Sequence, residues 1–203
     1  MVSETAPSRA LIFKLVISRP FNQNHQQKAL ATMTEQKPAK PLASIPSVLV
    51  IGANGFLGRT MSPLIAARHP KCKITLLDIA PAPTTTTSNL DQPYISGDIT
   101  DLASLTEILQ KVKPSAVIHS ASPPIPTVGK GDEKLFFRVN VEGTRNVIKA
   151  CNESGVKALI YTSSASVIYD GGNLVNANED TPFATRHVDP YNASKVTPAH
   201  LKH

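Results

Sequence analysis

The chain has 203 residues, of which 41% are hydrophobic and 18% are charged, so it is neither fully disordered nor collagen-like. It contains no stretch of about 18 uninterrupted apolar residues, which argues against a membrane-spanning helix. Two cysteines cannot build a disulfide scaffold, and no cysteine–histidine cluster has zinc spacing. We therefore expect a reducing compartment and no metal site.

The net charge of +6 is concentrated at the amino terminus. Residues 1–46 carry six basic and two acidic residues, a net charge of +4, and the rest of the chain carries the remaining +2. Because most of the chain is nearly neutral, the basic balance does not indicate nucleic acid as a partner.

Residues 1–46 lack the pattern of a domain, since Gln, Asn, Ser and Pro dominate and Lys37–Pro41 disfavours both helix and sheet. We predict a disordered leader or linker here. One alternative is a mitochondrial presequence, because basic residues are spaced among apolar ones with no acidic residue between Glu4 and Glu35. Another is a start-site artefact, in which the protein begins at Met33.

After residue 46, short apolar runs alternate with helical patterns. The predicted strands are 47–51, 73–77, 94–96, 115–119 and 156–162. Three helices are predicted: one runs from the glycine-rich turn to about Arg68, and the others cover 102–112 and 132–152. A loop is predicted over 80–93. This alternation predicts an α/β fold, with a Rossmann-type doubly wound parallel sheet.

The turn after the first strand has the spacing G-x-x-G-x-x-G over residues 52–58, not the more usual G-x-G-x-x-G. The first glycine permits a backbone conformation that strains other residues, the second permits close approach of a pyrophosphate, and the third permits tight helix–strand packing. Phosphates would lie at the helix N-terminus, where free N–H groups favour negative charge. We therefore expect dinucleotide binding through Gly52, Asn54, Gly55, Phe56, Leu57 and Gly58.

Acidic residues follow the second and third strands. Asp78 ends the second strand, 20 residues after the last glycine of the loop, where a carboxylate accepts hydrogen bonds from an adenosine ribose and repels a 2′-phosphate. This favours NAD over NADP, although Arg59 offers a cation for a 2′-phosphate. Asp98 can meet the adenine amino group while Ile99 packs on the ring, and a helix cap by Asp98 or Asp101 is an equal alternative.

Tyr191 and Lys195 form an i, i+4 pair, so on a helix both side chains share one face. A tyrosine is a poor base at neutral pH, but a neighbouring ammonium group stabilises the phenolate and lowers the tyrosine pKa. Tyr191 could then remove an alcohol proton while a hydride leaves for NAD⁺. Such pairs are common by chance, and the position after the fifth strand gives this one its weight.

Other polar residues lie near the ends of the predicted strands. A hydroxyl after the fifth strand can hold a substrate oxygen, with Ser164 as first choice and Ser166 as second, unless these serines only satisfy loop backbone groups. Asn140 could anchor a water relay to Lys195, satisfy a bulged backbone, or simply be solvated. His119 is interpreted as structural. A serine hydrolase is not supported, because no G-x-S-x-G motif is present.

Six motifs, taken together and in order, resemble the extended short-chain dehydrogenase/reductases. They are GANGFLG at 52–58, GDITD at 97–101, HSASP at 119–123, VNVEGTRNVI at 139–148, YTSSASV at 161–167 and YNASK at 191–195. More narrowly, residues 143–171 resemble the 3β-hydroxysteroid dehydrogenase branch, in particular the fungal sterol-4α-carboxylate 3-dehydrogenases (decarboxylating). Nucleotide-sugar epimerases share the same skeleton of motifs.

The resemblance implies that NAD⁺ oxidises the 3β-hydroxyl of a 4α-carboxysterol to a ketone, and that the resulting β-keto acid loses CO₂. It implies catalytic roles for Ser164, Tyr191 and Lys195, a relay role for Asn140, and a place for Ala121 among the cofactor residues. It also implies a homodimer, and peripheral association with the endoplasmic reticulum or lipid droplets.

The chain departs from the family pattern after residues 191–195. It ends eight residues after Lys195, whereas the family continues with further strands and a substrate lobe. Pro198 falls inside the expected catalytic helix, at a cost of about 3 kcal/mol, which would misplace Tyr191 and Lys195. We therefore expect a truncated NAD-binding domain over 47–203 with slow or no sterol turnover. A nucleotide-sugar epimerase or dehydratase and a non-catalytic NAD-binding module are the alternatives.

Overall fold

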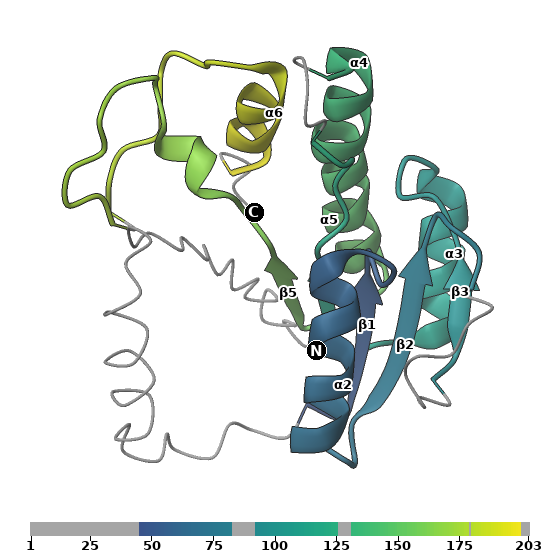
Figure 1. Cartoon of the computed structure of the whole chain (residues 1–203). Helices are drawn as coiled ribbons and strands as arrows, with labels where there is room; N and C mark the ends of the chain where they lie inside the picture. The colour runs from purple at the N-terminus through teal and green to yellow at the C-terminus, as the bar shows by residue number, and fades with distance from the viewer. Residues whose placement is uncertain (1–44, 83–91, 126–130, 179, 200–203) are drawn as a thin grey trace, which may run out of the picture.

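Figure 1 shows the computed structural model of the chain, which describes residues 45–82, 92–125, 131–178 and 180–199. The predicted leader over 1–46 lies outside the described residues except for its last two positions. Most of the predicted loop over 80–93 also lies outside them.

The described part of the chain is built on one parallel sheet with the strand order β3-β2-β1-β4-β5. All neighbouring strands pair in parallel. The strands are β1 (Ser47–Ile51), β2 (Lys73–Asp78), β3 (Tyr94–Ser96), β4 (Ala116–His119) and β5 (Ala158–Tyr161). The predicted Rossmann-type sheet is confirmed, with β5 shorter than the expected 156–162.

Alternate residues of the central strand supply the cores on the two faces of the sheet. Val48 and Val50 pack with side chains of α2 (Phe56–Arg68) on one face. Leu49 and Ile51 pack on the other face with α3 (Leu102–Val112) and α5 (Thr144–Glu153). Because both faces are covered, β1 reads as a continuous apolar run. Because β1 is the central strand, the glycine loop that follows it lies at the middle of the edge formed by the carboxyl ends of the strands.

The helix predicted over 132–152 is not one regular α-helix. It consists of α4 (Glu133–Phe136), a π-helical segment η1 (Phe137–Gly143), and α5. Asn140 and Gly143 are weak α-helix formers inside η1, and a Cβ atom at Gly143 would lie 2.7 Å from Ile99 Cδ1. The wider π turn therefore lies where this helix comes close to Ile99, which follows β3.

The last described helix, α6 (Pro190–Ala199), packs against η1 and against a 3₁₀ turn, η2 (Ala165–Ile168). It starts where the sequence predicts. Pro198 is the penultimate residue of the helix, so the missing N–H affects only its last turn. Tyr191 and Lys195 both lie within this helix, so Pro198 does not break the helix before either residue.

None of the helices in the described ranges combines the length and the apolar character needed to cross a membrane.

Candidate active site

The glycine loop joins β1 to α2 through close backbone contacts at its first and third glycines. Gly52 has a φ of +85°, and a Cβ atom there would lie 2.6 Å from the Ala121 backbone nitrogen. A Cβ atom at Gly58 would lie 2.3 Å from the Gly52 oxygen, whereas at Gly55 the same distance is 3.2 Å. The first and third glycines are therefore required by backbone packing, and the second is the least confined.

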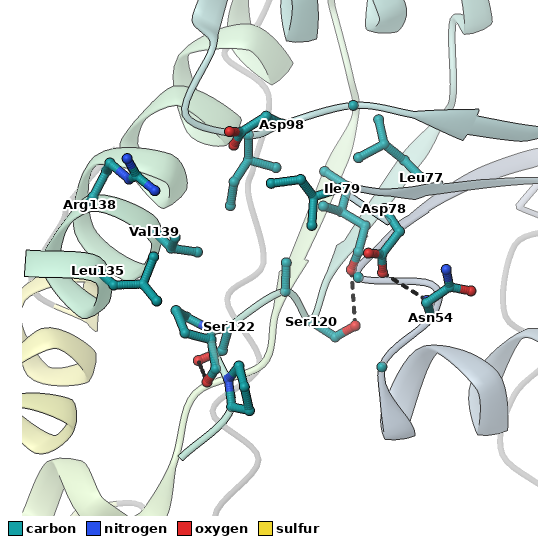
Figure 2. Close-up of a pocket in the computed structure, with 18 residues that line it drawn as sticks. Asn54, Leu77, Asp78, Ile79, Asp98, Ser120, Ser122, Leu135, Arg138 and Val139 are labelled. Atoms are coloured by element: carbon teal, nitrogen blue, oxygen red, sulfur yellow. Dashed lines mark hydrogen bonds between the residues drawn. The ribbon is translucent and has the colours of Figure 1, made fainter. Parts of the chain in front are cut away.

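A pocket of about 400 Å³ opens at the carboxyl ends of the strands, beside this loop (Figure 2). Its lining comes from the glycine loop, from the ends of β2, β3 and β4, and from α4 and η1. Seven of the ten residues predicted to bind cofactor line it: Gly52, Asn54, Gly55, Asp78, Asp98, Ile99 and Ala121.

The other three predicted cofactor residues are not part of the lining. Phe56 is 86% exposed and Leu57 is 37% exposed, in the first turn of α2, and Gly58 is buried against the loop backbone. Their side chains therefore form none of the pocket wall. No side chain among the described residues caps the start of α2, so its first backbone N–H groups are available to an anion.

Backbone donors fix the two acidic residues at the pocket. Asp78 Oδ2 accepts from the Asn54 N–H at 2.8 Å, and Oδ1 accepts from the Ala80 N–H at 3.1 Å. Asp98 Oδ1 accepts from the Thr100 N–H at 2.8 Å. The cap of α3 is Asp101, so the helix-cap alternative applies to Asp101 and leaves Asp98 in the pocket wall.

Sequence reasoning missed a number of the pocket residues. Ser120 lies directly after β4, beside Ala121, and the rule that ligands bind at strand ends was enough to find it. Leu135, Arg138 and Val139 reach the pocket from α4 and η1, and no local pattern marks them (Figure 2). The rest of the missed lining is Ile51, Leu77, Ile79, Gly97, Ser122, Pro123 and Pro124.

A second polar group surrounds Lys195, which is only 3% exposed. Its ammonium group donates to the Thr162 carbonyl oxygen at 3.0 Å and lies 4.6 Å from the centre of the Tyr161 ring. Burial lowers the pKa of Lys195 to about 8. Both contacts come from the end of β5, so the helix and the strand together position the charge.

Tyr191 lies one turn before Lys195 on α6, half-buried, with its ring edge-on to Phe136 at 5.6 Å between ring centres. The contact with α4 holds the ring on the side of the helix that faces the rest of the domain. The i, i+4 pair predicted from the sequence is therefore helical, and whether it is catalytic remains a prediction.

Asn140 is buried within η1, which contradicts the reading of it as a solvated residue. Its amide nitrogen donates to Ser194 Oγ at 2.9 Å. Its Oδ1 atom has no partner within the described residues. An acceptor left free near α6 fits a water relay, but the proposed link to Lys195 stays a prediction.

The two candidate serines interact with each other at the start of η2. Ser164 Oγ accepts from the Ser166 N–H at 3.2 Å and from the Ser166 hydroxyl at 2.9 Å. The loop-satisfying role is therefore real, yet Ser164 keeps its own hydroxyl proton to donate. The neighbouring Ser163 hydroxyl, which sequence reasoning did not single out, is buried without a partner in the described part of the chain.

His119, at the end of β4, is fully buried. Its Nε2 atom lies 3.0 Å from Thr144 Oγ1, and its ring centre lies 5.3 Å from that of Tyr161. Burial, together with the charge of Lys195, lowers the pKa of His119 to about 3. A neutral ring held between a strand and a helix agrees with the structural role expected for this residue.

The 3-beta hydroxysteroid dehydrogenase/isomerase family model matches residues 49–201, three quarters of the chain. The chain belongs to this family. The resemblance seen in the motifs is thereby confirmed.

Curated relatives agree with this assignment. Sterol-4-alpha-carboxylate 3-dehydrogenase of Candida albicans is 34% identical over 75% of this chain and 44% of its own length. The decarboxylating enzyme of the same name from Bos taurus is 39% identical over 72% of this chain and 38% of its own length. The chain thus spans less than half the length of these relatives.

Solved structures share the fold. The UDP-glucose 4-epimerase of Thermus thermophilus, in complex with NAD, has a TM-score of 0.66 and 28% identity, over 76% of this chain and 49% of that protein. WbmG of Bordetella bronchiseptica, also in complex with NAD, has a TM-score of 0.64 and 28% identity, over 78% and 49%.

Proposed function

We propose that this chain forms the cofactor-binding and catalytic part of an NAD-dependent enzyme that oxidises the 3β-hydroxyl of a 4α-carboxysterol to a ketone, with loss of CO₂. The observation that carries the proposal is the buried ammonium of Lys195, one helical turn from Tyr191. The named activity of the relatives supplies the substrate class.

The residues of the pocket fit a dinucleotide. Two glycines, Gly52 and Gly58, occur where any Cβ atom would collide with backbone, and the uncapped start of α2 offers N–H groups to a pyrophosphate. Asp78 is held by two backbone donors and keeps lone pairs for ribose hydroxyls, which favours NAD over NADP. When bound, NAD⁺ accepts a hydride from the carbon that bears the substrate hydroxyl.

Tyr191 acts as the base for the substrate hydroxyl in this proposal. The positive charge of Lys195 stabilises the negative charge that develops on the tyrosine oxygen as the proton is transferred. Ser164 donates its free hydroxyl proton to the same substrate oxygen. Tyr191 and Ser164 thereby hold the substrate oxygen while its proton is removed, and Lys195 supports Tyr191.

Decarboxylation follows from the chemistry of the product. Once the ketone is formed, the 4α-carboxylate is β to a carbonyl group, so the electron pair of the breaking C–C bond moves towards the carbonyl oxygen. CO₂ leaves, and the enolate takes up a proton. Hydrogen-bond donors to that oxygen, such as Ser164, stabilise the developing negative charge.

The test measures binding first and turnover second. Calorimetry with NAD checks the pocket, and formation of NADH and CO₂ from a 4α-carboxysterol checks the reaction. Tyr191→Phe should retain NAD binding and lose at least about a hundredfold in turnover, because only the catalytic hydroxyl is removed. Tyr169→Phe, the same substitution at a partly exposed tyrosine, is the matched control and should change neither.

Three outcomes would contradict the proposal. Absence of NAD binding would remove the cofactor site. Turnover of a UDP-sugar in place of the carboxysterol would favour a nucleotide-sugar epimerase or dehydratase, the class to which the epimerase relative belongs. NAD binding with no turnover of either substrate, by a chain shown to be the natural full product, would favour a non-catalytic NAD-binding module.

We further propose that the enzyme works at the surface of the endoplasmic reticulum or lipid droplets, because its proposed substrate is a lipid, and that it forms the homodimer implied by the family resemblance. Cell fractionation with an antibody to the chain checks the location. Recovery in mitochondria would instead support the presequence interpretation of the first 46 residues.

A further inference from the structure

Asn54 connects three segments on the Asp78 side of the pocket. Its backbone N–H donates to Asp78 Oδ2 at 2.8 Å, and its side-chain amide donates to the Tyr94 hydroxyl at 2.9 Å and to the Pro81 carbonyl at 3.1 Å. The Tyr94 hydroxyl in turn donates to the Ala80 carbonyl at 2.6 Å. The glycine loop, the start of β3 and the residues after β2 are thereby tied together.

The donors and acceptors of this set allow only one arrangement. The Pro81 and Ala80 carbonyl oxygens can only accept hydrogen bonds. The Asn54 amide therefore donates through its NH₂ group to Pro81, and the Tyr94 hydroxyl donates its proton to Ala80. The hydroxyl oxygen then accepts from Asn54. Burial and the charge of Asp78 raise the pKa of Tyr94, against a smaller lowering by Arg59, so the hydroxyl stays protonated.

We infer that Asn54 and Tyr94 are positioning residues that set the preference for NAD over NADP. They fix the backbone of Ala80 and Pro81, and the N–H of Ala80 is one of the two donors that hold the Asp78 carboxylate. The carboxylate therefore cannot turn away from the place where the adenosine ribose binds. The inference rests on the proposed NAD binding.

A 2′-phosphate would meet this carboxylate at close range, and two negative charges there repel each other. Relief requires the carboxylate to rotate or the segment after β2 to move outwards. Either motion breaks hydrogen bonds that hold Asp78, Ala80 and Pro81, and the side chains of Asn54 and Tyr94 make several of these bonds. Without them the segment moves more easily, and Arg59, on the first turn of α2, supplies a cation for the phosphate.

Tyr94 is not part of the pocket lining, so it acts only through Asn54 and Ala80. A substitution of Tyr94 therefore tests positioning of Asp78 without removing a direct contact with the cofactor. Tyr94→Phe removes a single oxygen and keeps the ring, and Asn54→Ala removes both side-chain donors while the backbone N–H to Asp78 remains.

The experiment titrates NAD and NADP into the purified 203-residue chain by calorimetry and compares the ratio of the two dissociation constants. We expect the preference for NAD to fall about fivefold in Tyr94→Phe and about tenfold in Asn54→Ala, through weaker NAD binding and less impaired NADP binding. Tyr169→Phe and Asn152→Ala, the same changes at exposed positions, should leave the ratio unchanged.

Equal weakening of both cofactors, with the ratio unchanged within about twofold, would mean that the two residues only stabilise the fold, and would overturn the inference. Melting temperatures of the variants identify this case. Tyr94→Phe keeps the test decisive if Asn54→Ala fails to fold. A wild-type chain that binds neither cofactor would overturn the proposed function itself, and this inference with it.

Discussion

The region around the glycine loop and the region around Lys195 treat their buried polar groups differently. At the loop, both oxygens of Asp78 accept hydrogen bonds and the Asn54 amide uses both of its N–H groups. Around Lys195, Asn140 Oδ1, Ser163 Oγ and His119 Nδ1 have no partner in the described part of the chain. The polar groups of the loop region are partnered by backbone groups and by the Tyr94 hydroxyl, whereas the Lys195 region leaves buried polar atoms without a partner in the described part of the chain.

This difference indicates which buried groups lower the free energy of unfolding. An unpartnered buried polar atom costs about 1–3 kcal/mol, and a buried charge costs more. Such costs are retained at sites where a substrate, a water molecule or a cofactor supplies the missing hydrogen-bond partner. We therefore expect the loop region to depend mainly on shape, and the Lys195 region to depend mainly on protonation.

The largest expected effect tests the dependence of the loop on shape. Gly58→Ala should lower the free energy of unfolding by about 4 kcal/mol or more, because the new Cβ atom meets backbone at 2.3 Å. Denaturant unfolding measures this. Gly155→Ala is the control, since its φ of +69° strains alanine but no described residue lies within 4 Å of the new Cβ atom, and it should cost only about 1–2 kcal/mol. Equal costs would remove the contrast.

An intermediate effect concerns His119 at acid pH. The unfolded ring takes up a proton below its ordinary pKa of 6.5, whereas the buried ring, facing Lys195, Tyr161 and Thr144, stays neutral down to about 3. Stability is therefore lost as the pH falls through this window, by about 3 kcal/mol at about pH 4. His119→Gln, which cannot be protonated, should show a shallower decline in unfolding titrations. Parallel declines would refute the assignment.

The smallest of these effects concerns Lys195 at alkaline pH. The unfolded side chain stays charged up to its ordinary pKa of 10.5, whereas the folded one loses its proton at about 8. The free energy of unfolding should therefore rise between these two values. Lys195→Met should lack this rise and exceed the wild type by about 2 kcal/mol at about pH 7, where the wild type buries a charge. A variant less stable than the wild type at neutral pH would contradict this account.

The strands and most helix ends could be read from the sequence because their signals are local. The apolar run of β1, the cap Asp101 and the glycine spacing each act within a few residues. The helix predicted over 132–152 is confirmed as the uninterrupted series α4, η1 and α5, but its π segment was not predicted, because that segment coincides with contacts to Ser194 and Ile99 from distant parts of the chain. The effect expected of Pro198 was overstated because the proline falls in the final turn of α6.

The sequence by itself determined the order of the strands and helices, the family, and the positions of Gly52, Gly58 and Asp78, since a turn and a strand end are short-range features. Only the tertiary structure decided which side chains share an environment. Lys195 meets Tyr161 across 34 residues, and Asn54 meets Tyr94 across 40. Such contacts depend on the order of the strands in the sheet and on how the helices pack against it. Hydrophobic burial drives this packing but is non-directional, so it does not specify which distant residues meet.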